Sequence, residues 1–243
     1  KRKRASGKNS LENAGTTTSK VNTQVQKKET GAGKLMLPQK QWYDSSTADP
    51  EQVKRLCREW NLNQFVAEIL LRRGYKTHEE IRSFLIPELK NLLDPYELRQ
   101  MREAVNLLQK MIAENRRIVI LGDYDVDGTT SVALMTSFLQ TLTHQVTPYI
   151  PDRYKEGYGV SYRGIDHAAS LGISLIVALD CGVKAVDKVA YAKEKGIDFI
   201  ICDHHLPGEH LPDAVAVLDP KRTDCSYPYK ELAGCGIGFK LIQ

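Results

Sequence analysis

Five short apolar runs, separated by helical patterns in the second half of the chain, constrain the fold more than any other feature. They occupy residues 118–121, 146–150, 175–179, 199–202 and 215–218. Between them, apolar residues recur at three- and four-residue steps, as in Leu134, Phe138 and Leu142, which is typical of helices. This alternation predicts an α/β domain with an open, mostly parallel sheet covered by helices on both faces.

Acidic residues and histidines follow three of these runs. They are Asp123, Asp125, Asp127, Asp180, Asp203, His204 and His205. Each aspartate could simply cap the next helix. However, ligands bind open α/β sheets beyond the carboxyl ends of the strands, so charge at three strand ends favours a functional site at one edge of the sheet.

The acids after the first run stand at alternate positions. Alternate side chains of an extended segment share a face, so Asp123, Asp125 and Asp127 project together if the strand continues that far. Like charges crowded in this way disfavour ionisation unless a cation joins them. A solvated acidic turn is the other interpretation, because Asp and Gly also form turns.

The predicted edge suits metal-assisted phosphoester hydrolysis. Carboxylate oxygens with an imidazole nitrogen favour Mn²⁺ or Mg²⁺, and at least four acids suit two ions. Gly128, Thr129 and Ser131 open the next helix, where free N–H groups and the helix dipole favour phosphate.

A loop over residues 152–161 combines a cation, tyrosines and glycines. We expect Arg153 to hold phosphate and Tyr158 to stack on a base, as in proteins that bind single strands. A tight turn with an ion-paired arginine is an equally simple interpretation. The glycines of residues 234–238 lack the leading strand of a dinucleotide site, so a helix start is expected there.

Composition fits a globular chain with a substantial core, because 42% of its 243 residues are hydrophobic and 26% are charged. No stretch is long and apolar enough to span a bilayer, and no partner membrane is expected. The five scattered cysteines lack paired metal-ligand spacing, which suits a reducing cytoplasm. Residues 1–40 carry ten Lys and Arg against two Glu, whereas the remainder has 24 against 28, so the net charge of +4 is no argument that the folded part binds nucleic acid.

Three segments are predicted. Residues 1–37 are polar and lack periodic apolar content, so we expect a disordered basic tail. Residues 38–115 have a helical pattern, with a capping box from Thr77 to Glu80, and form a small helical lead-in. Residues 116–243 form the α/β domain.

Four motifs, in this order, resemble those of the DHH phosphoesterases. They are Asp125-Val126-Asp127-Gly128, Asp152-Arg153 with Gly157-Tyr158-Gly159, Asp180-Cys181-Gly182, and Asp203-His204-His205. The resemblance covers about residues 40–243 and is greatest to the RecJ-like branch, the single-strand-specific 5′ to 3′ DNA exonucleases of bacteria.

This resemblance implies roles for individual residues. It makes Asp125, Asp127, Asp180 and His204 ligands of Mn²⁺ or Mg²⁺. His205 would lie near the scissile phosphate and Asp203 would orient the imidazoles. Asp123 would act either as a substitute ligand or behind the ligands.

The resemblance also implies a cytoplasmic enzyme of DNA repair and recombination. Its substrate would be single-stranded DNA, and a single-stranded DNA-binding protein and a helicase would be its partners. A further metal-binding Asp, a DHHA1 domain and an OB-fold would follow Gln243, so the activity of this fragment is an open question.

Three other interpretations stand beside this one. A DHH-type enzyme could act instead on short oligonucleotides, cyclic dinucleotides or pyrophosphate. The chain could also be an inactive DHH scaffold. Asp125 to Thr129 fits the opening motif of haloacid-dehalogenase-type phosphatases, but the histidine pair would have no function there.

Overall fold

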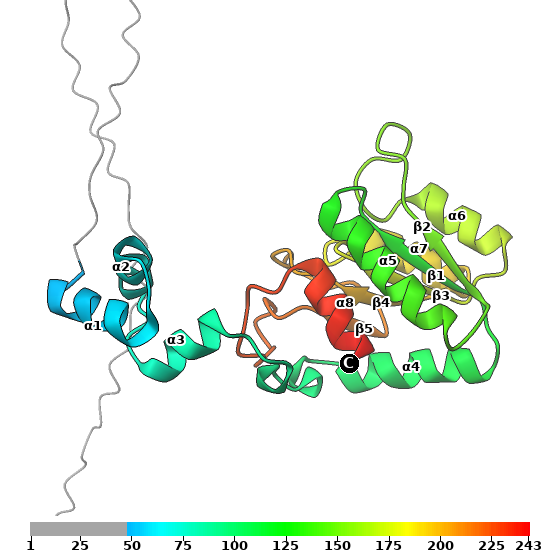
Figure 1. Ribbon diagram of the computed structural model, residues 1–243. Helices are drawn as coiled ribbons and strands as arrows, with labels where there is room; N and C mark the ends of the chain where they lie inside the picture. The colour runs from blue at the N-terminus through cyan, green and yellow to red at the C-terminus, as the bar shows by residue number, and fades with distance from the viewer. Residues whose placement is uncertain (1–47) are drawn as a thin grey trace, which may run out of the picture. The chain divides into compact units, whose positions relative to one another are not determined.

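The structure, a computed structural model, describes residues 48–243 and divides into two compact units (Figure 1). The first ends at Ile86 and the second runs from Pro87 to Gln243. The predicted disordered tail of residues 1–37 lies outside the described residues. No described helix has the length and apolar character needed to cross a membrane.

The described part of the first unit, from residue 48 onward, contains three helices around a small core. They are α1 (Pro50–Trp60), α2 (Gln64–Arg72) and α3 (His78–Leu85). Leu56, Leu70 and Ile81 are buried together between them. The predicted capping box is confirmed, because Thr77 Oγ1 accepts from Glu80 N at 3.2 Å while Glu80 Oε2 accepts from Thr77 N at 2.9 Å.

The second unit carries the sheet. Its helices are η1 (Leu89–Asn91), η2 (Pro95–Glu97), α4 (Met101–Ala113), α5 (Val126–Gln140), α6 (Tyr162–Ser170), α7 (Val186–Glu194) and α8 (Gly234–Ile242). Its strands are β1 (Ile118–Gly122), β2 (Val146–Tyr149), β3 (Leu175–Leu179), β4 (Asp198–Cys202) and β5 (Ala216–Leu218). All five predicted strands are therefore present, each within one residue of its expected ends.

The sheet has the order β2-β1-β3-β4-β5, and every pair is parallel. Alternate strand residues face opposite sides, so Ile118 and Ile120 join one buried cluster while Val119 and Leu121 join another. Helices α4, α5 and α8 pack in the first cluster, and α6 and α7 pack in the second (Figure 1). The predicted α/β class, with helices on both faces, is confirmed.

Helix α4 packs with the sheet, although its sequence pattern resembles that of the preceding helices. Met101, Ala104, Leu108 and Met111 are buried in the same cluster as the strands. The compact unit consequently begins at Pro87, ahead of the boundary at residue 116 that the sequence suggests. Burial of an apolar face is what assigns a helix to a core, and periodicity alone does not show which core that is.

Strand order places a switch point between β1 and β3. The chain passes from β1 outward to β2 and then returns to the other side of β1. In doubly wound sheets the crevice for ligands lies at such a point, beyond the carboxyl ends of the strands. Asp123 and Asp180 follow directly after these two strands.

Candidate metal and catalytic site

Four aspartates form a row along the carboxyl edge of the sheet. The strands pair Gly122 with Leu179, Leu179 with Cys202, and Cys202 with Leu218. Each acid is the next residue along its strand, so the row runs in the order Asp123, Asp180, Asp203 and Asp219. None of the four is more than 1% exposed. Because neighbouring strands lie about 4.8 Å apart, buried carboxyl groups accumulate at this edge.

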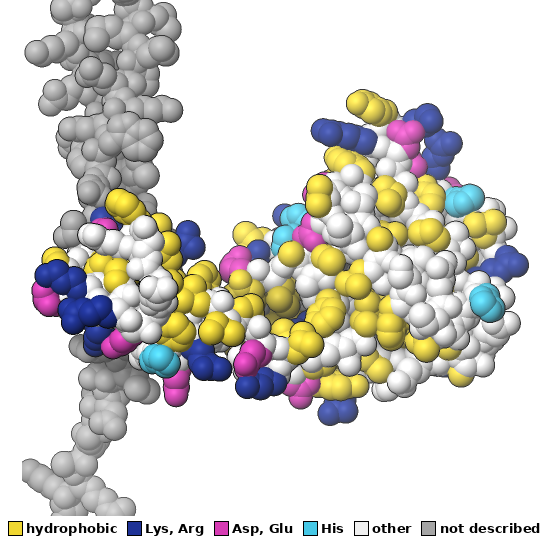
Figure 2. All heavy atoms as spheres, viewed as in Figure 1, with side chains coloured by type: hydrophobic (Ala, Val, Ile, Leu, Met, Phe, Trp, Pro, Cys, Tyr) yellow, Lys and Arg dark blue, Asp and Glu magenta, His cyan; other side chains and the backbone are white. Residues whose placement is uncertain are grey.

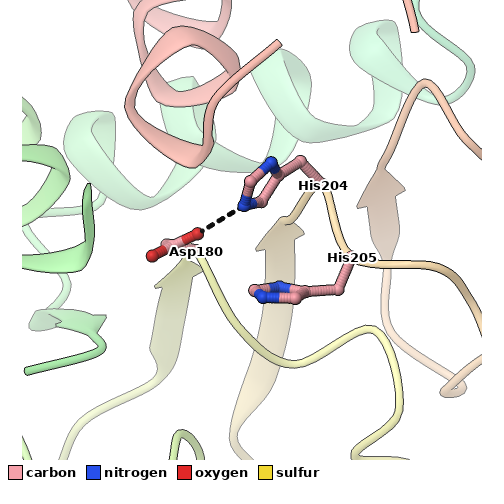
Figure 3. A group of neighbouring side chains, drawn as sticks. All are labelled: Asp180, His204 and His205. Carbon is pink, nitrogen blue, oxygen red and sulfur yellow. Dashed lines mark ion pairs between the residues drawn. The ribbon is translucent and has the colours of Figure 1, made fainter. Parts of the chain in front are cut away.

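Asp180 is the centre of the candidate site. His204 Nε2 lies 3.1 Å from Asp180 Oδ1 as an ion pair (Figure 3). That oxygen nevertheless accepts no well-aligned hydrogen bond from the described residues. Burial, followed by the charges of Asp127 and Asp125, raises the pKa of Asp180 to about 7. A buried carboxylate oxygen with a free lone pair is suited to a cation.

Asp203 organises the two histidines that follow it. Its Oδ1 accepts from His204 N at 2.7 Å and lies 2.7 Å from His205 Nδ1, while its Oδ2 accepts from Val183 N at 2.9 Å. Asp203 therefore holds the imidazole of His205 directly but only the backbone of His204, and its role in orienting both imidazoles stays a prediction. Figure 3 shows His204 directed toward Asp180 and His205 beside it.

Asp125 and Asp127 lie at the start of α5. Asp125 caps the helix, with its Oδ1 accepting from Gly128 N at 2.9 Å. The carboxylate of Asp127 accepts from Gly234 N and Cys235 N, both at 2.7 Å, at the N-terminus of α8. His204 Nε2 is 3.7 Å from Asp127 Oδ2. The structure thus brings Asp127, Asp180 and His204 together.

The expectation that Asp123, Asp125 and Asp127 share one face of a strand is wrong. β1 ends at Gly122 and α5 begins at Val126. The chain must turn here because the helix packs directly on the strand end, where a Cβ on Gly128 would lie 2.4 Å from Asp123 O. Glycine permits this approach.

Asp123 is separated from the other two acids by its burial. Burial raises its pKa, the backbone of Tyr124 acts to lower it by hydrogen bonding, and the charge of Asp125 raises it further. Its Oδ1 has no hydrogen-bond partner among the described residues. Both predicted roles of Asp123, as a ligand and as a group behind the ligands, stay predictions.

Only some of the residues predicted to bind substrate lie close to the histidines at the carboxyl edge of the sheet. Tyr158 Oη is 3.3 Å from His205 Nε2, and the Arg153 guanidinium lies 5.1 Å from the ring centre of Tyr124. In contrast, Thr129 Oγ1 donates to Asp125 O at 2.7 Å, and the hydroxyl of the buried Ser131 donates to Asp127 O at 2.6 Å. The helix backbone uses both hydroxyls, and their predicted contact with phosphate stays a prediction.

Comparison with known proteins gives the family. The model of the DHH family, N-terminal domain, matches residues 117–243. The chain belongs to the DHH family. The matched range contains the whole row of aspartates and both histidines.

Curated relatives within this DHH family are longer than the chain. It is 43% identical over 208 residues to the single-stranded-DNA-specific exonuclease RecJ of Bacillus subtilis, covering 86% of this chain and 26% of the relative. It is 41% identical to the RecJ of Haemophilus influenzae, covering 71% of this chain and 30% of that protein. The chain therefore spans between a quarter and a third of these relatives.

Solved structures agree with the assignment to the DHH family. Exonuclease RecJ bound to manganese matches with a TM-score of 0.56 at 32% identity, covering 62% of this chain and 38% of that one. RecJ of Thermus thermophilus in complex with Mn²⁺ matches with a TM-score of 0.63 at 25% identity, covering 82% and 27%.

The residues of this DHH domain fit a divalent cation. One ligand atom each from Asp180, His204 and His205 lies within 4.8 Å of the others. An oxygen and imidazole donor set suits Mn²⁺ better than metals that seek thiolate. His205, to which the sequence predicts a catalytic role, thus stands with two predicted ligands.

Sequence reasoning missed two parts of the site. Asp219 follows β5 as the other acids follow their strands, so the same positional rule would have found it. Gly234 lies against Asp180, where a Cβ would come within 2.5 Å of Oδ1. No local signal marks that contact, because it joins residues that are far apart in the chain.

Proposed function

We propose that this chain is the DHH part of a metal-dependent exonuclease that hydrolyses single-stranded DNA from 5′ to 3′ in DNA repair and recombination. The observation that carries the proposal is the convergence of Asp127, Asp180 and His204 at the carboxyl edge of a DHH sheet. The names of the relatives, single-stranded-DNA-specific exonucleases, supply the substrate class.

We assign Asp125, Asp127, Asp180 and His204 as ligands of Mn²⁺ or Mg²⁺, with two ions in the complete enzyme. Ions at such a site supply a hydroxide at neutral pH and neutralise charge on the phosphoryl oxygens. The buried Oδ1 of Asp180, which lacks a hydrogen bond from the described residues, supports this assignment.

His205 is the proposed proton-carrying group. Asp203 accepts from its Nδ1 at 2.7 Å and so directs Nε2 outward. Tyr158 Oη lies 3.3 Å from that nitrogen, and burial, followed by the charges of Asp123 and Asp203, raises the pKa of Tyr158, which keeps the phenol protonated. His205 can carry a proton on Nε2 to an oxygen of the scissile phosphate.

Arg153 and Tyr158 are the proposed contacts to the nucleic acid. The guanidinium would pair with phosphate, and the ring would stack on a base. A single-stranded DNA-binding protein and a helicase are proposed partners, and the cytoplasm is the proposed location.

The test uses 5′-labelled single-stranded DNA with Mn²⁺, duplex DNA as a control, and EDTA to remove the metal. Both the chain and a version extended past Gln243 to the length of its relatives are assayed. We expect the extended protein to release mononucleotides from single strands alone. The proposal fails if it releases none.

Two further results identify the alternatives. Hydrolysis of pyrophosphate or dinucleotides, without cleavage of longer strands, would assign the chain to another branch of the DHH enzymes. Binding of single-stranded DNA without any hydrolysis by either version would make it a scaffold.

A further inference from the structure

The loop between β2 and α6, residues 150–161, carries two of the proposed substrate contacts. Figure 2 shows charged and hydrophobic side chains gathered on this projecting loop. Tyr158 meets His205 at 3.3 Å, and its ring lies edge-on to Tyr124 with 6.4 Å between centres. The guanidinium of Arg153 lies over the ring of Tyr124. The loop therefore delivers a cation and an aromatic ring to the edge where His205 stands.

The hydrogen bonds within the loop's own backbone lie before Tyr158, where Lys155 N and Glu156 N donate to Asp152 O at 3.1 and 2.8 Å. Gly157 and Gly159, on either side of Tyr158, have φ of 84° and 67°. Glycine adopts these values freely, so such a segment has many accessible conformations. An anchor from outside the two glycines is needed to hold Tyr158 against His205.

Glu156 supplies that anchor. Its Oε2 accepts from Tyr149 Oη at 2.6 Å and from Ser161 Oγ at 2.7 Å, and its Oε1 accepts from Asp152 N at 3.0 Å. These partners are the last residue of β2, the N-cap of α6 and the beginning of the loop. One carboxylate thus ties both ends of the loop to the sheet.

The network is suited to a permanently charged carboxylate. Burial acts to raise the pKa of Glu156, but the hydrogen bonds from Tyr149, Ser161 and Asp152 outweigh it and hold this pKa below its ordinary value. Burial also raises the pKa of Tyr149 to about 12. Tyr149 therefore remains a donor to Glu156 at any pH at which the enzyme would be assayed.

We propose that Glu156 is a positioning residue that holds residues 150–161 so that Tyr158 contacts His205 and Arg153 faces the bound strand. This role rests on the proposed function for its effect on DNA. Its structural part, the contact between Tyr158 and His205, can be measured without substrate.

The first experiment measures cleavage of single-stranded DNA by the extended protein. We expect Glu156→Ala to raise KM about tenfold, the effect of losing roughly 1.4 kcal/mol of positioning, with kcat within threefold. Glu156→Gln keeps one acceptor oxygen, but its amide NH₂ group would face a partner that also donates. We therefore expect an intermediate KM. Glu194→Ala, which removes an exposed acid at the end of α7, should leave both constants unchanged.

A double-mutant cycle separates positioning from general destabilisation. If Glu156 acts through Tyr158 and Arg153, adding Glu156→Ala to a protein that carries both Tyr158→Ala and Arg153→Ala should raise KM by less than twofold. A full tenfold effect in that background would overturn the proposal.

The second experiment needs no activity. NMR of the imidazole signals should show His205 shifted in Glu156→Ala to the position seen in Tyr158→Phe, while His210 is unchanged. An unshifted His205 overturns the proposal even where the melting temperature falls. If the wild-type protein cleaves no DNA, the proposed function fails, and this spectrum alone decides whether Glu156 positions the loop.

Discussion

Asp180 is held in a conformation that an isolated aspartate does not favour. Its φ is 60°, in the left-handed region that most L-residues avoid and that Asp and Asn tolerate best. The side chain is also buried among like charges, with its pKa raised to about 7 by burial, Asp127 and Asp125. Strain of this kind persists where the surrounding structure enforces it, and it clusters at active sites.

Asp180→Ala should abolish metal-dependent cleavage with the fold retained, because it removes a proposed ligand and relieves repulsion in the metal-free protein. The measurements are nuclease activity of the extended protein and a circular dichroism melt. Asp180→Asn is the matched variant: it keeps the size and the tolerance of positive φ, and should be inactive with an equal or higher melting temperature. Unchanged turnover in either variant would remove Asp180 from the site.

Asp219→Asn should stabilise the protein at neutral pH. Burial raises the pKa of Asp219 from 3.8 to about 6, and its Oδ2 has no hydrogen-bond partner among the described residues. A raised carboxyl pKa means that the folded state disfavours the charged form of Asp219. The stability of the wild-type protein therefore falls as the pH rises from about 4 to 6, and it stays reduced at higher pH. The gain, at most about 3 kcal/mol, should be full at pH 8 and vanish near pH 3 in denaturant titrations.

Asp224→Asn is the control with the opposite sign. The side-chain hydrogen bond from Arg222 lowers the pKa of Asp224, so this carboxylate contributes stability above its unfolded pKa that is lost as the pH falls. Its substitution should destabilise slightly at pH 8 and have no effect in acid. Parallel pH profiles for Asp219→Asn and Asp224→Asn would contradict the assignment.

At the scale of elements, the N-terminus of α8 contacts two of the proposed ligands. The N–H groups at its start bind Asp127, and helix N-termini favour negative charge. The same turn lies directly against Asp180. This close contact is possible because Gly234 has no side chain. One helix end therefore fixes two of the proposed ligands.

Gly234→Ala should weaken Mn²⁺ binding and destabilise the fold by about 1–3 kcal/mol, since its Cβ would lie 2.5 Å from Asp180 Oδ1. Gly236→Ala, in the same helix, meets only Leu232 at 3.4 Å and should stabilise by up to about 1 kcal/mol. Calorimetric Mn²⁺ titration and thermal melts check the pair. Equal effects of the two substitutions would show that α8 does not shape the site.

The elements themselves were largely predictable, whereas their contacts were not. Buried parallel strands such as β3 consist of continuous apolar residues, and this pattern is visible in the sequence. The path of the chain after Gly122 was mispredicted, because the turn depends on Gly128 packing against the backbone of Asp123. The bonds from Asp127 to Gly234 and Cys235 join residues more than a hundred positions apart, and no local pattern encodes them.

At the scale of the whole molecule, each compact unit has its own buried core. A fragment of residues 87–243 should therefore keep a cooperative melt and its affinity for Mn²⁺. A fragment of residues 116–243, the domain that the sequence suggests, lacks the buried Met101, Leu108 and Met111 of α4. At about 1.5–3 kcal/mol for each buried side chain, the loss approaches the whole stability of a domain.

The two fragments are compared by thermal melting and by binding of a dye for exposed apolar surface. We expect the fragment of residues 116–243 to bind the dye and the fragment of residues 87–243 not to bind it. A cooperative melt of that shorter fragment would contradict the assignment of α4 to the core of the sheet.

The row of aspartates has a consequence for assembly. Each acid stands one residue beyond a strand whose neighbours are paired in register, so a slip of one position in any strand would turn its carboxyl group away from the others. A cation held by Asp180 and His204, which follow the neighbouring strands β3 and β4, would therefore bind only to a correctly registered sheet. Metal binding would therefore stabilise the sheet with the correct strand register relative to compact states in which a strand has slipped.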